Sequence, residues 1–149
     1  MEKVVRYRIA KIGLPEYSLN EKPNYSITGD DCEVTMNLGI ATLREEQQLR
    51  IDLRARYIDK RTQEELSDFK VDFYFSILDF ENTFSYMNDR VNIPDGLLLD
   101  AMSITIGTAR GMLVIRNEET YLSEIYLPIY NVLDLLSLIK AQQSPIAGS

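Results

Sequence analysis

The chain has 149 residues, a net charge of −7, one cysteine and no histidine, and this is the length of a single domain that buries about two thirds of its unfolded surface. The missing histidine excludes the commonest general base at neutral pH, the commonest catalytic zinc ligand and every Ser-His or Cys-His pair. The negative charge argues against a nucleic-acid partner, because phosphate binding depends on clustered Lys and Arg, and the lone Cys32 excludes an internal disulfide.

The first predicted element is a strand over residues 4–12, where Val5, Tyr7 and Ile9 occupy alternate positions. No apolar run or cleavage site typical of a signal peptide precedes it, so we expect a cytoplasmic location. Residues 13–31 contain prolines, glycines and polar residues without a sustained period. This segment is predicted to be a long connection rather than a tight hairpin.

Three further strands are indicated by runs in which apolar and polar residues alternate. The apolar positions are Val34, Met36, Leu38 and Ile40, then Leu49, Ile51, Leu53, Ala55 and Tyr57, then Phe69, Val71, Phe73, Phe75 and Ile77. Short polar links at residues 44–47 and 59–64 join these runs, which favours an antiparallel meander. We therefore expect a four-stranded sheet with one covered face and one wet face.

A long helix is predicted to follow Asn92, a helix-capping residue type, with Pro94 in its first turn. The β-branched residues 104–106 would also permit a strand, but the length of the segment and its start signal favour a helix. Apolar residues recur on more than one side of this helix. No window approaches the ~18 uninterrupted apolar residues of a membrane span, so no membrane insertion is expected.

The second predicted helix opens at Pro128, after a linker over residues 116–127. Its apolar face comprises Ile129, Val132, Leu133, Leu136 and Ile139. Residues 144–149 have little to bury and are predicted to form a flexible tail. The chain is thus interpreted as one α+β domain over residues 1–143, with an antiparallel sheet followed by two helices.

Catalytic chemistry has few candidates in this sequence. The paired carboxylates at residues 30–31, 79 with 81, and 118–119 fall at predicted element ends, where solvated turn residues are common. None has the spacing of a metal-binding loop, and no glycine-rich phosphate loop occurs. We expect no enzymatic activity, cofactor or metal; a small-molecule-binding or carboxylate-dependent enzyme domain is the least favoured alternative.

Gly107 and Gly111 lie inside the predicted long helix, where each glycine costs about 1 kcal/mol relative to alanine. Small residues four apart allow close approach of another backbone, either this chain's own sheet or a second subunit. The apolar surface on several sides of the helix exceeds what one sheet can cover, which favours a homo-oligomer. The interface residues predicted are Met102, Ile106, Gly107, Arg110 and Gly111.

The order of elements, the segment MSITIGTARGML at residues 102–113 and the segment YLPI at residues 126–129 resemble the SecB family of export chaperones and SecB-like proteins. The pair Arg110 and Gly111 is the strongest part of this resemblance. The resemblance implies a four-stranded antiparallel sheet backed by two helices, assembled into dimers or tetramers through the long helix. It also implies hydrophobic grooves that hold unfolded polypeptide clients without ATP.

The same resemblance makes residues 13–31 a crossover loop and places the groove along this loop, the linker and the second helix. The groove candidates are Tyr17, Tyr25, Tyr121, Leu122, Tyr126, Tyr130, Leu133 and Leu136. Phe73 and Phe75 are interpreted as core residues in preference to groove residues. Family members pass clients to the SecA motor or guard an antitoxin of a toxin-antitoxin pair. A structural protein that oligomerises with one dedicated partner is the main alternative to a chaperone.

Overall fold

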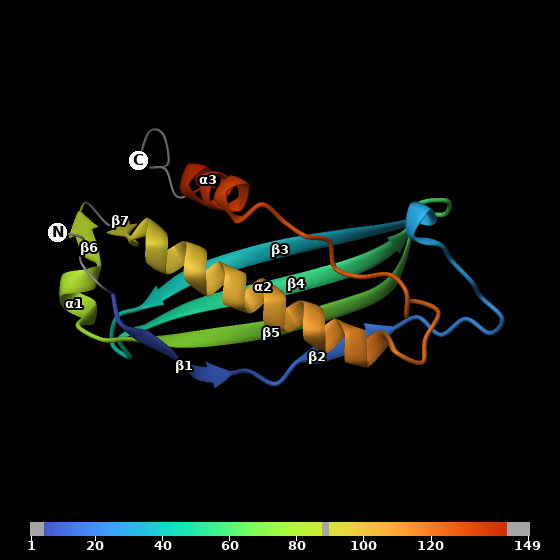
Figure 1. Cartoon of the computed structure of the whole chain (residues 1–149), viewed down its shortest axis with the longest axis horizontal. Helices are drawn as coiled ribbons and strands as arrows, with labels where there is room; N and C mark the ends of the chain where they lie inside the picture. Colours follow the sequence, from blue (N-terminus) through green and yellow to red (C-terminus); the bar gives the residue numbers. More distant parts are fainter. Residues whose placement is uncertain (1–4, 88–89, 143–149) are drawn as a thin grey trace.

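Three long strands form most of the sheet in the computed structural model, which describes residues 5–87 and 90–142 (Figure 1). They are β3 (Cys32–Leu43), β4 (Gln48–Asp59) and β5 (Glu64–Ile77), and β4 pairs antiparallel with both neighbours. Tight turns link them, with Gln47 and Gln63 in the left-handed conformation at φ 56° and 63°. The predicted antiparallel meander is confirmed for these three strands.

The other edge of the sheet consists of β1 (Tyr7–Ile12) and β2 (Glu16–Leu19), which both pair antiparallel with β5. The sheet order is therefore β1-β5-β4-β3, with β2 continuing the line of β1 along β5. The prediction that residues 13–31 are irregular was wrong for β2. Four residues are too few for a period to emerge from sequence, and the adjacent Pro15 reads as a break.

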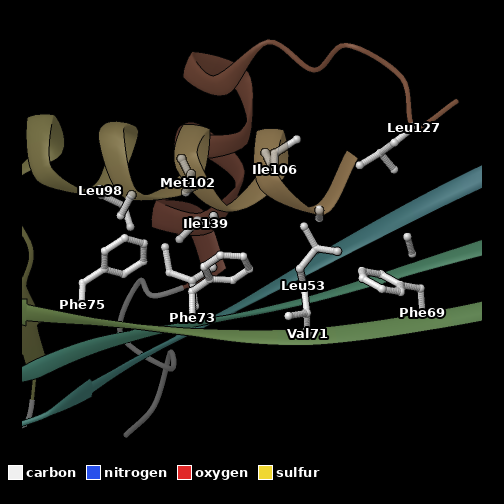
Figure 2. Close-up of a cluster of buried hydrophobic side chains, with 14 of the residues drawn as sticks. Leu53, Phe69, Val71, Phe73, Phe75, Leu98, Met102, Ile106, Leu127 and Ile139 are labelled. Atoms are coloured by element: carbon white, nitrogen blue, oxygen red, sulfur yellow. The ribbon is translucent and has the colours of Figure 1, made fainter. Parts of the chain in front are cut away.

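The core lies between one face of this sheet and the helix α2 (Asp95–Asn117) (Figure 2). On β4 and β5 the side chains alternate between buried and partly exposed, as expected when successive residues point to opposite faces. Leu98, Met102 and Ile106 of α2 point onto Phe73, Phe75 and Leu53 of the sheet. On the other face, Arg54 binds Asp68 through two hydrogen bonds of 2.9 and 2.8 Å, as expected for a solvated surface.

A short insertion between β5 and α2 was missed by the sequence prediction. It comprises a single helical turn, α1 (Phe80–Thr83), and a hairpin of β6 (Ser85–Met87) and β7 (Arg90–Asn92). Phe80 and Phe84 are buried with ring centroids 4.4 Å apart, so tertiary contacts hold the insertion against the core. Elements of three or four residues carry too weak a local signal to be recognised from sequence.

Helix α2 confirms the helical prediction for the β-branched stretch at residues 104–106. The buried hydroxyl of Thr105 donates to the carbonyl oxygen of Ala101 at 2.8 Å, which satisfies it within the helix. Asn92 belongs to β7 and does not cap the helix, which starts at Asp95 after Pro94. By length and composition α2 could cross a membrane, but its apolar character is also that of a core helix, because one face packs on the sheet.

The second long helix, α3 (Val132–Gln142), starts four residues later than predicted. The side chain of Asn131 explains this start, because its Oδ1 accepts hydrogen bonds from the backbone N–H groups of Leu133 and Asp134 at 3.0 and 3.3 Å. Leu136 and Ile139 are buried, and α3 contacts α2. The tail predicted for residues 144–149 lies outside the described residues.

Candidate functional site

The linker between α2 and α3 exposes large apolar side chains. Ile129 is 94% exposed and Tyr126 57%, and Leu133 at the start of α3 is 62% exposed. Ile125 and Leu127, on either side of Tyr126, are buried. The linker therefore has an inner set of side chains that completes the core and an outer set that faces solvent.

The position of the linker over the sheet follows from its contacts with β4. The hydroxyl of Tyr57 donates to the carbonyl oxygen of Ile125 at 3.3 Å, and burial raises the pKa of this phenol. Leu127 lies over the same layer of core side chains as Leu53 (Figure 2). The linker thus runs above β4 on the side of the sheet that α2 also covers.

Next to this part of β4, the edge strand β3 is only partly covered. Tyr57 pairs with Val34 and Leu53 with Leu38 in the antiparallel register. The apolar row of β3 that continues the core face is partly buried, whereas the corresponding rows of β4 and β5 are fully buried. We call the exposed linker side chains and this row the linker surface; it comprises Val34, Met36, Leu38, Ile40, Tyr126, Ile129 and Leu133.

The predicted groove residues of the linker and α3 are divided by the structure. Tyr126 and Leu133 are exposed on the linker surface, and Tyr130 is partly buried beside it. Leu122 and Leu136 are 0% and 7% exposed, so their prediction as groove residues is corrected. They complete the core because their positions face the sheet and α2. Ile129, the most exposed apolar residue of the linker, was predicted on the apolar face of the second helix but precedes α3.

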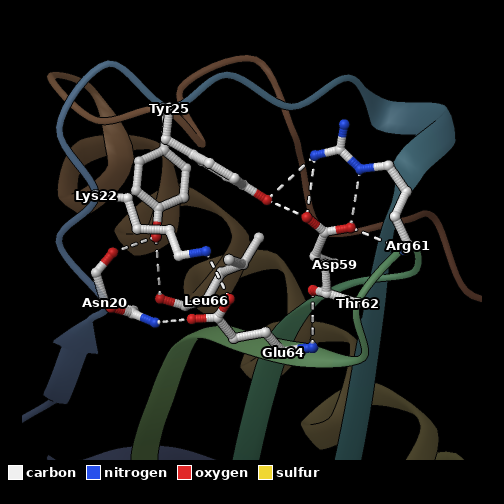
Figure 3. A network of polar contacts seen from close by, with 9 residues as sticks. Asn20, Lys22, Tyr25, Asp59, Arg61, Thr62, Glu64 and Leu66 are labelled. Carbon is white, nitrogen blue, oxygen red and sulfur yellow. Dashed lines mark hydrogen bonds and ion pairs between the residues drawn. The ribbon is translucent and has the colours of Figure 1, made fainter.

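Of the predicted tyrosines of the crossover segment, Tyr25 lies near the turn between β4 and β5 (Figure 3), and Tyr17 lies on β2. Tyr25 donates to the carboxylate of Asp59 and packs edge-on against Tyr121, with ring centroids 4.9 Å apart. Tyr121 in turn donates to the carbonyl oxygen of Asn20. Tyr17 donates to the Oδ1 of Asn117 at 2.6 Å. All three hydroxyls therefore serve as internal anchors.

Two carboxylates on the β4–β5 turn hold this crossover segment. Hydrogen bonds from Arg61 and Tyr25 keep the pKa of Asp59 well below its usual range. Glu64 accepts from Lys22 and from Asn20, and its pKa is lowered as well. Beside the segment lies an open depression of about 470 Å³, lined by Leu19, Glu21, Lys22, Pro23, Asn24, Tyr25, Glu119, Thr120 and Tyr121.

The outer face of α2 contains only some of the residues that were predicted for the subunit interface. Met102 and Ile106 are 0% and 4% exposed because they point into this chain's own core, so they are not available for a subunit interface. Gly107 and Gly111 face outward, and a Cβ added at either would meet nothing within 4 Å. Close packing on this chain's own sheet therefore does not explain the two glycines.

Further exposed apolar residues surround these glycines on α2 and on β1. Val114 and Ile115 are exposed on the last turns of α2. On the adjacent sheet edge, Ile9 and Ile12 are exposed, as is Leu14 after β1. Burial and the neighbouring Asp100 of α2 raise the pKa of Tyr7, which places β1 beside the helix. The sequence did not identify these five residues as exposed, because residue type and local period do not show which apolar side chains a neighbour covers.

The candidate catalytic groups are not assembled into a site. Burial raises the pKa of the Cys32 thiol to about 11, which leaves it protonated at neutral pH. Among the described residues no three His, Cys, Asp or Glu side chains could together hold a metal ion. Asp30 is exposed in the short 3-10 helix η1 (Gly29–Asp31), and Asp79 and Glu119 are exposed in turns elsewhere.

Comparisons with known proteins support the fold at the level of solved structures. A scan against protein-family models and a search of curated proteins found no match. Among solved structures, the chain is similar to a SecB-like chaperone of Mycobacterium tuberculosis in complex with a ChAD peptide from the HigA1 antitoxin. The identity is 10%, the TM-score 0.50, and the match covers 85% of this chain and 91% of that chain. This similarity confirms the predicted SecB-like α+β fold.

Proposed function

We propose that the protein is a holdase-type chaperone that binds unfolded polypeptides without ATP. The observation that carries this proposal is the linker surface, where Tyr126, Ile129 and Leu133 are exposed and the apolar row of β3 is only partly buried. Contiguous exposed apolar side chains on a folded protein commonly mark a binding site. The SecB-like fold supports the same function, because the similar solved structure holds a peptide.

Binding at this surface requires no chemical step. An unfolded segment that covers apolar side chains gains roughly 25 cal/mol for each Å² removed from water, less the cost of ordering the segment. An open surface with aliphatic residues and a tyrosine sets few demands on the sequence of the client. Such binding is reversible and delays aggregation without consuming nucleotide.

We further propose that the outer face of α2 and the β1 edge bind a second copy of the chain in a dimer or tetramer. The outward Gly107 and Gly111 leave room for close approach of a partner helix. Ile9, Ile115 and Leu14 supply apolar area around them. Light scattering coupled to size exclusion measures the assembly, and Gly107→Leu is expected to reduce its mass.

The clients proposed for this surface are polypeptides that expose apolar segments before they fold or bind a partner. An antitoxin that is unstable until it meets its toxin exposes apolar segments, as does a preprotein that awaits export. The peptide in the similar structure derives from an antitoxin, which makes an antitoxin the first client to test; transfer to SecA is the second. A cytoplasmic location is part of this proposal.

The chaperone proposal is tested by mixing the protein with a slowly refolding client and recording light scattering. At stoichiometric amounts the wild type is expected to delay aggregation, and the variant Tyr126→Ser with Ile129→Ser to lose most of this effect. Leu138→Ser is the matched control, because Leu138 is also exposed but lies on α3 away from the linker. No delay by the wild type would refute the proposal, and capture of one specific protein without general activity would favour a dedicated assembly role.

A further inference from the structure

Arg110 makes contacts that neither its sequence position nor its predicted interface role explains. It lies on α2 between Gly107 and Gly111. Its Nε donates to the carbonyl oxygen of Leu127 at 3.0 Å, and a terminal guanidinium nitrogen donates to that of Pro128 at 2.6 Å. The side chain therefore binds two successive carbonyl groups of the linker.

We infer that Arg110 is a positioning residue, which holds the linker so that its outer apolar side chains face the client. This inference rests on the proposed function, because it assigns the residue that shapes the same surface. Residues 125–131 belong to no helix or strand, so regular backbone pairing does not fix their orientation. The two hydrogen bonds from Arg110 supply an orientation that the linker backbone lacks.

The choice of arginine follows from the geometry of the two carbonyls. A guanidinium has a rigid planar fork and offers several N–H donors, so it can bind two acceptors at once. Lysine offers one ammonium group on a flexible stem and does not reproduce this fork. Pro128 favours an extended conformation at Leu127, which keeps the linker backbone in a form that the guanidinium of Arg110 can bind.

Anchoring the backbone decides which side chains reach solvent. In an extended chain successive side chains point to opposite sides. Ile125 and Leu127 face the core, and Tyr126 faces outward. Rotation of the linker about its own axis would bring Leu127 to the surface and bury Tyr126. By holding the carbonyls of Leu127 and Pro128, Arg110 selects the set of side chains that the linker presents.

The test compares Arg110→Leu, which removes the donors, with Arg110→Lys, which keeps the charge but not the fork. Arg116→Leu is the matched control, because Arg116 is exposed on the last turn of α2. Hydrogen exchange measures the backbone over residues 125–131 and over β4. Fluorescence anisotropy measures affinity for labelled, reduced and carboxymethylated α-lactalbumin, a permanently unfolded polypeptide.

In Arg110→Leu, exchange over residues 125–131 is expected to rise about tenfold or more, which corresponds to the loss of charge-assisted hydrogen bonds. Exchange over β4 is expected to be unchanged, and affinity for the unfolded polypeptide to fall about tenfold. Arg110→Lys is expected to give a smaller loss in both, and Arg116→Leu to match the wild type. Unchanged β4 exchange shows that the variant is folded.

Three results would overturn the inference. Unchanged exchange in the linker of both Arg110 variants means that the two hydrogen bonds do not hold it. Faster exchange with unchanged affinity in these variants means that Arg110 anchors the linker, but that the linker does not bind the client. A reduced mass of the assembly in the Arg110 variants, with unchanged exchange in the linker, means that Arg110 acts at the subunit interface, as the sequence predicted. Failure of the wild type to bind the unfolded polypeptide refutes the proposed function itself, and Arg110 is then only an anchor of the linker.

Discussion

The crossover segment and the linker are both connections rich in tyrosine, but the structure holds them in opposite ways. In the crossover segment, side chains make the anchoring contacts: Tyr17 and Tyr25 donate their hydroxyl groups to Asn117 and Asp59. In residues 125–131 of the linker the backbone is anchored, through its carbonyl groups, by Tyr57 and Arg110. The linker side chain of Tyr126 is left exposed. A tyrosine in a connection is therefore a binding candidate only when its hydroxyl is not needed internally.

The largest effect is expected where a predicted groove residue is in fact a core residue. Leu122→Ala should lower the free energy of unfolding by about 2–5 kcal/mol, because it leaves a cavity in a fully buried site. Ile129→Ala should change the free energy of unfolding by less than about 0.5 kcal/mol. Urea denaturation measures both values. A large loss of stability in Ile129→Ala would show that this linker side chain is packed rather than presented.

A smaller effect is expected when an anchoring hydroxyl is removed. Tyr17→Phe leaves the 2% exposed Asn117 without the donor to its Oδ1, at a cost of about 1–3 kcal/mol in the free energy of unfolding. Tyr126→Phe removes an exposed hydroxyl, and its cost should be within about 0.5 kcal/mol. Thermal denaturation of the two variants makes the comparison. Equal costs would remove the distinction between an anchored and a presented tyrosine.

The smallest effect is expected at the partly exposed ion pair between Lys22 of the crossover segment and Glu64 of β5. Lys22 lowers the pKa of Glu64, with a contribution from Asn20. A lowered carboxyl pKa stabilises the fold above the ordinary value of about 4.3, and this contribution is lost as the pH falls through the lowered pKa. Glu64→Gln should therefore weaken the crossover segment slightly at pH 7 and not at low pH, and 1 M salt should reduce the difference.

Hydrogen exchange over residues 20–31 measures this change, with Glu21→Gln as the control for removal of an exposed carboxylate from the same segment. Equal exchange in wild type and Glu64→Gln at pH 7 and low salt would show that Tyr25 and its partners hold the segment without the ion pair. Faster exchange in the linker of the same variant would show that the two connections are not independent.

Several features were predicted from sequence because they depend on a strong local period. Strict alternation predicted β3, β4 and β5, and the long apolar segment after Pro94 predicted α2. The position of β1 beside β5 was not predicted from periodicity, because pairing between strands far apart in the chain has no local signal. The start of α3 was misplaced at Pro128, because the sequence alone did not reveal that Asn131 is the cap.

The candidate site was predicted in part, at the level of segments. The linker was correctly identified as a tyrosine-bearing approach to the last helix, but its most exposed residue, Ile129, was assigned to the apolar face of that helix. Leu122 and Leu133 are both leucines near the end of the chain, yet one is buried and the other 62% exposed. Residue type does not separate them, since exposure depends on which neighbours cover each position.

The sequence by itself determined the α+β class, the periodic strands and the absence of histidine-based chemistry, because composition and local period are properties of the chain alone. Only the tertiary structure decided which apolar residues are covered. Met102 and Ile106 turn toward the sheet, whereas Gly107 and Gly111 on the same helix turn away from it. It also decided that Arg110 binds carbonyl groups 17 and 18 residues further along the chain, a contact that exists only when the linker folds back over α2.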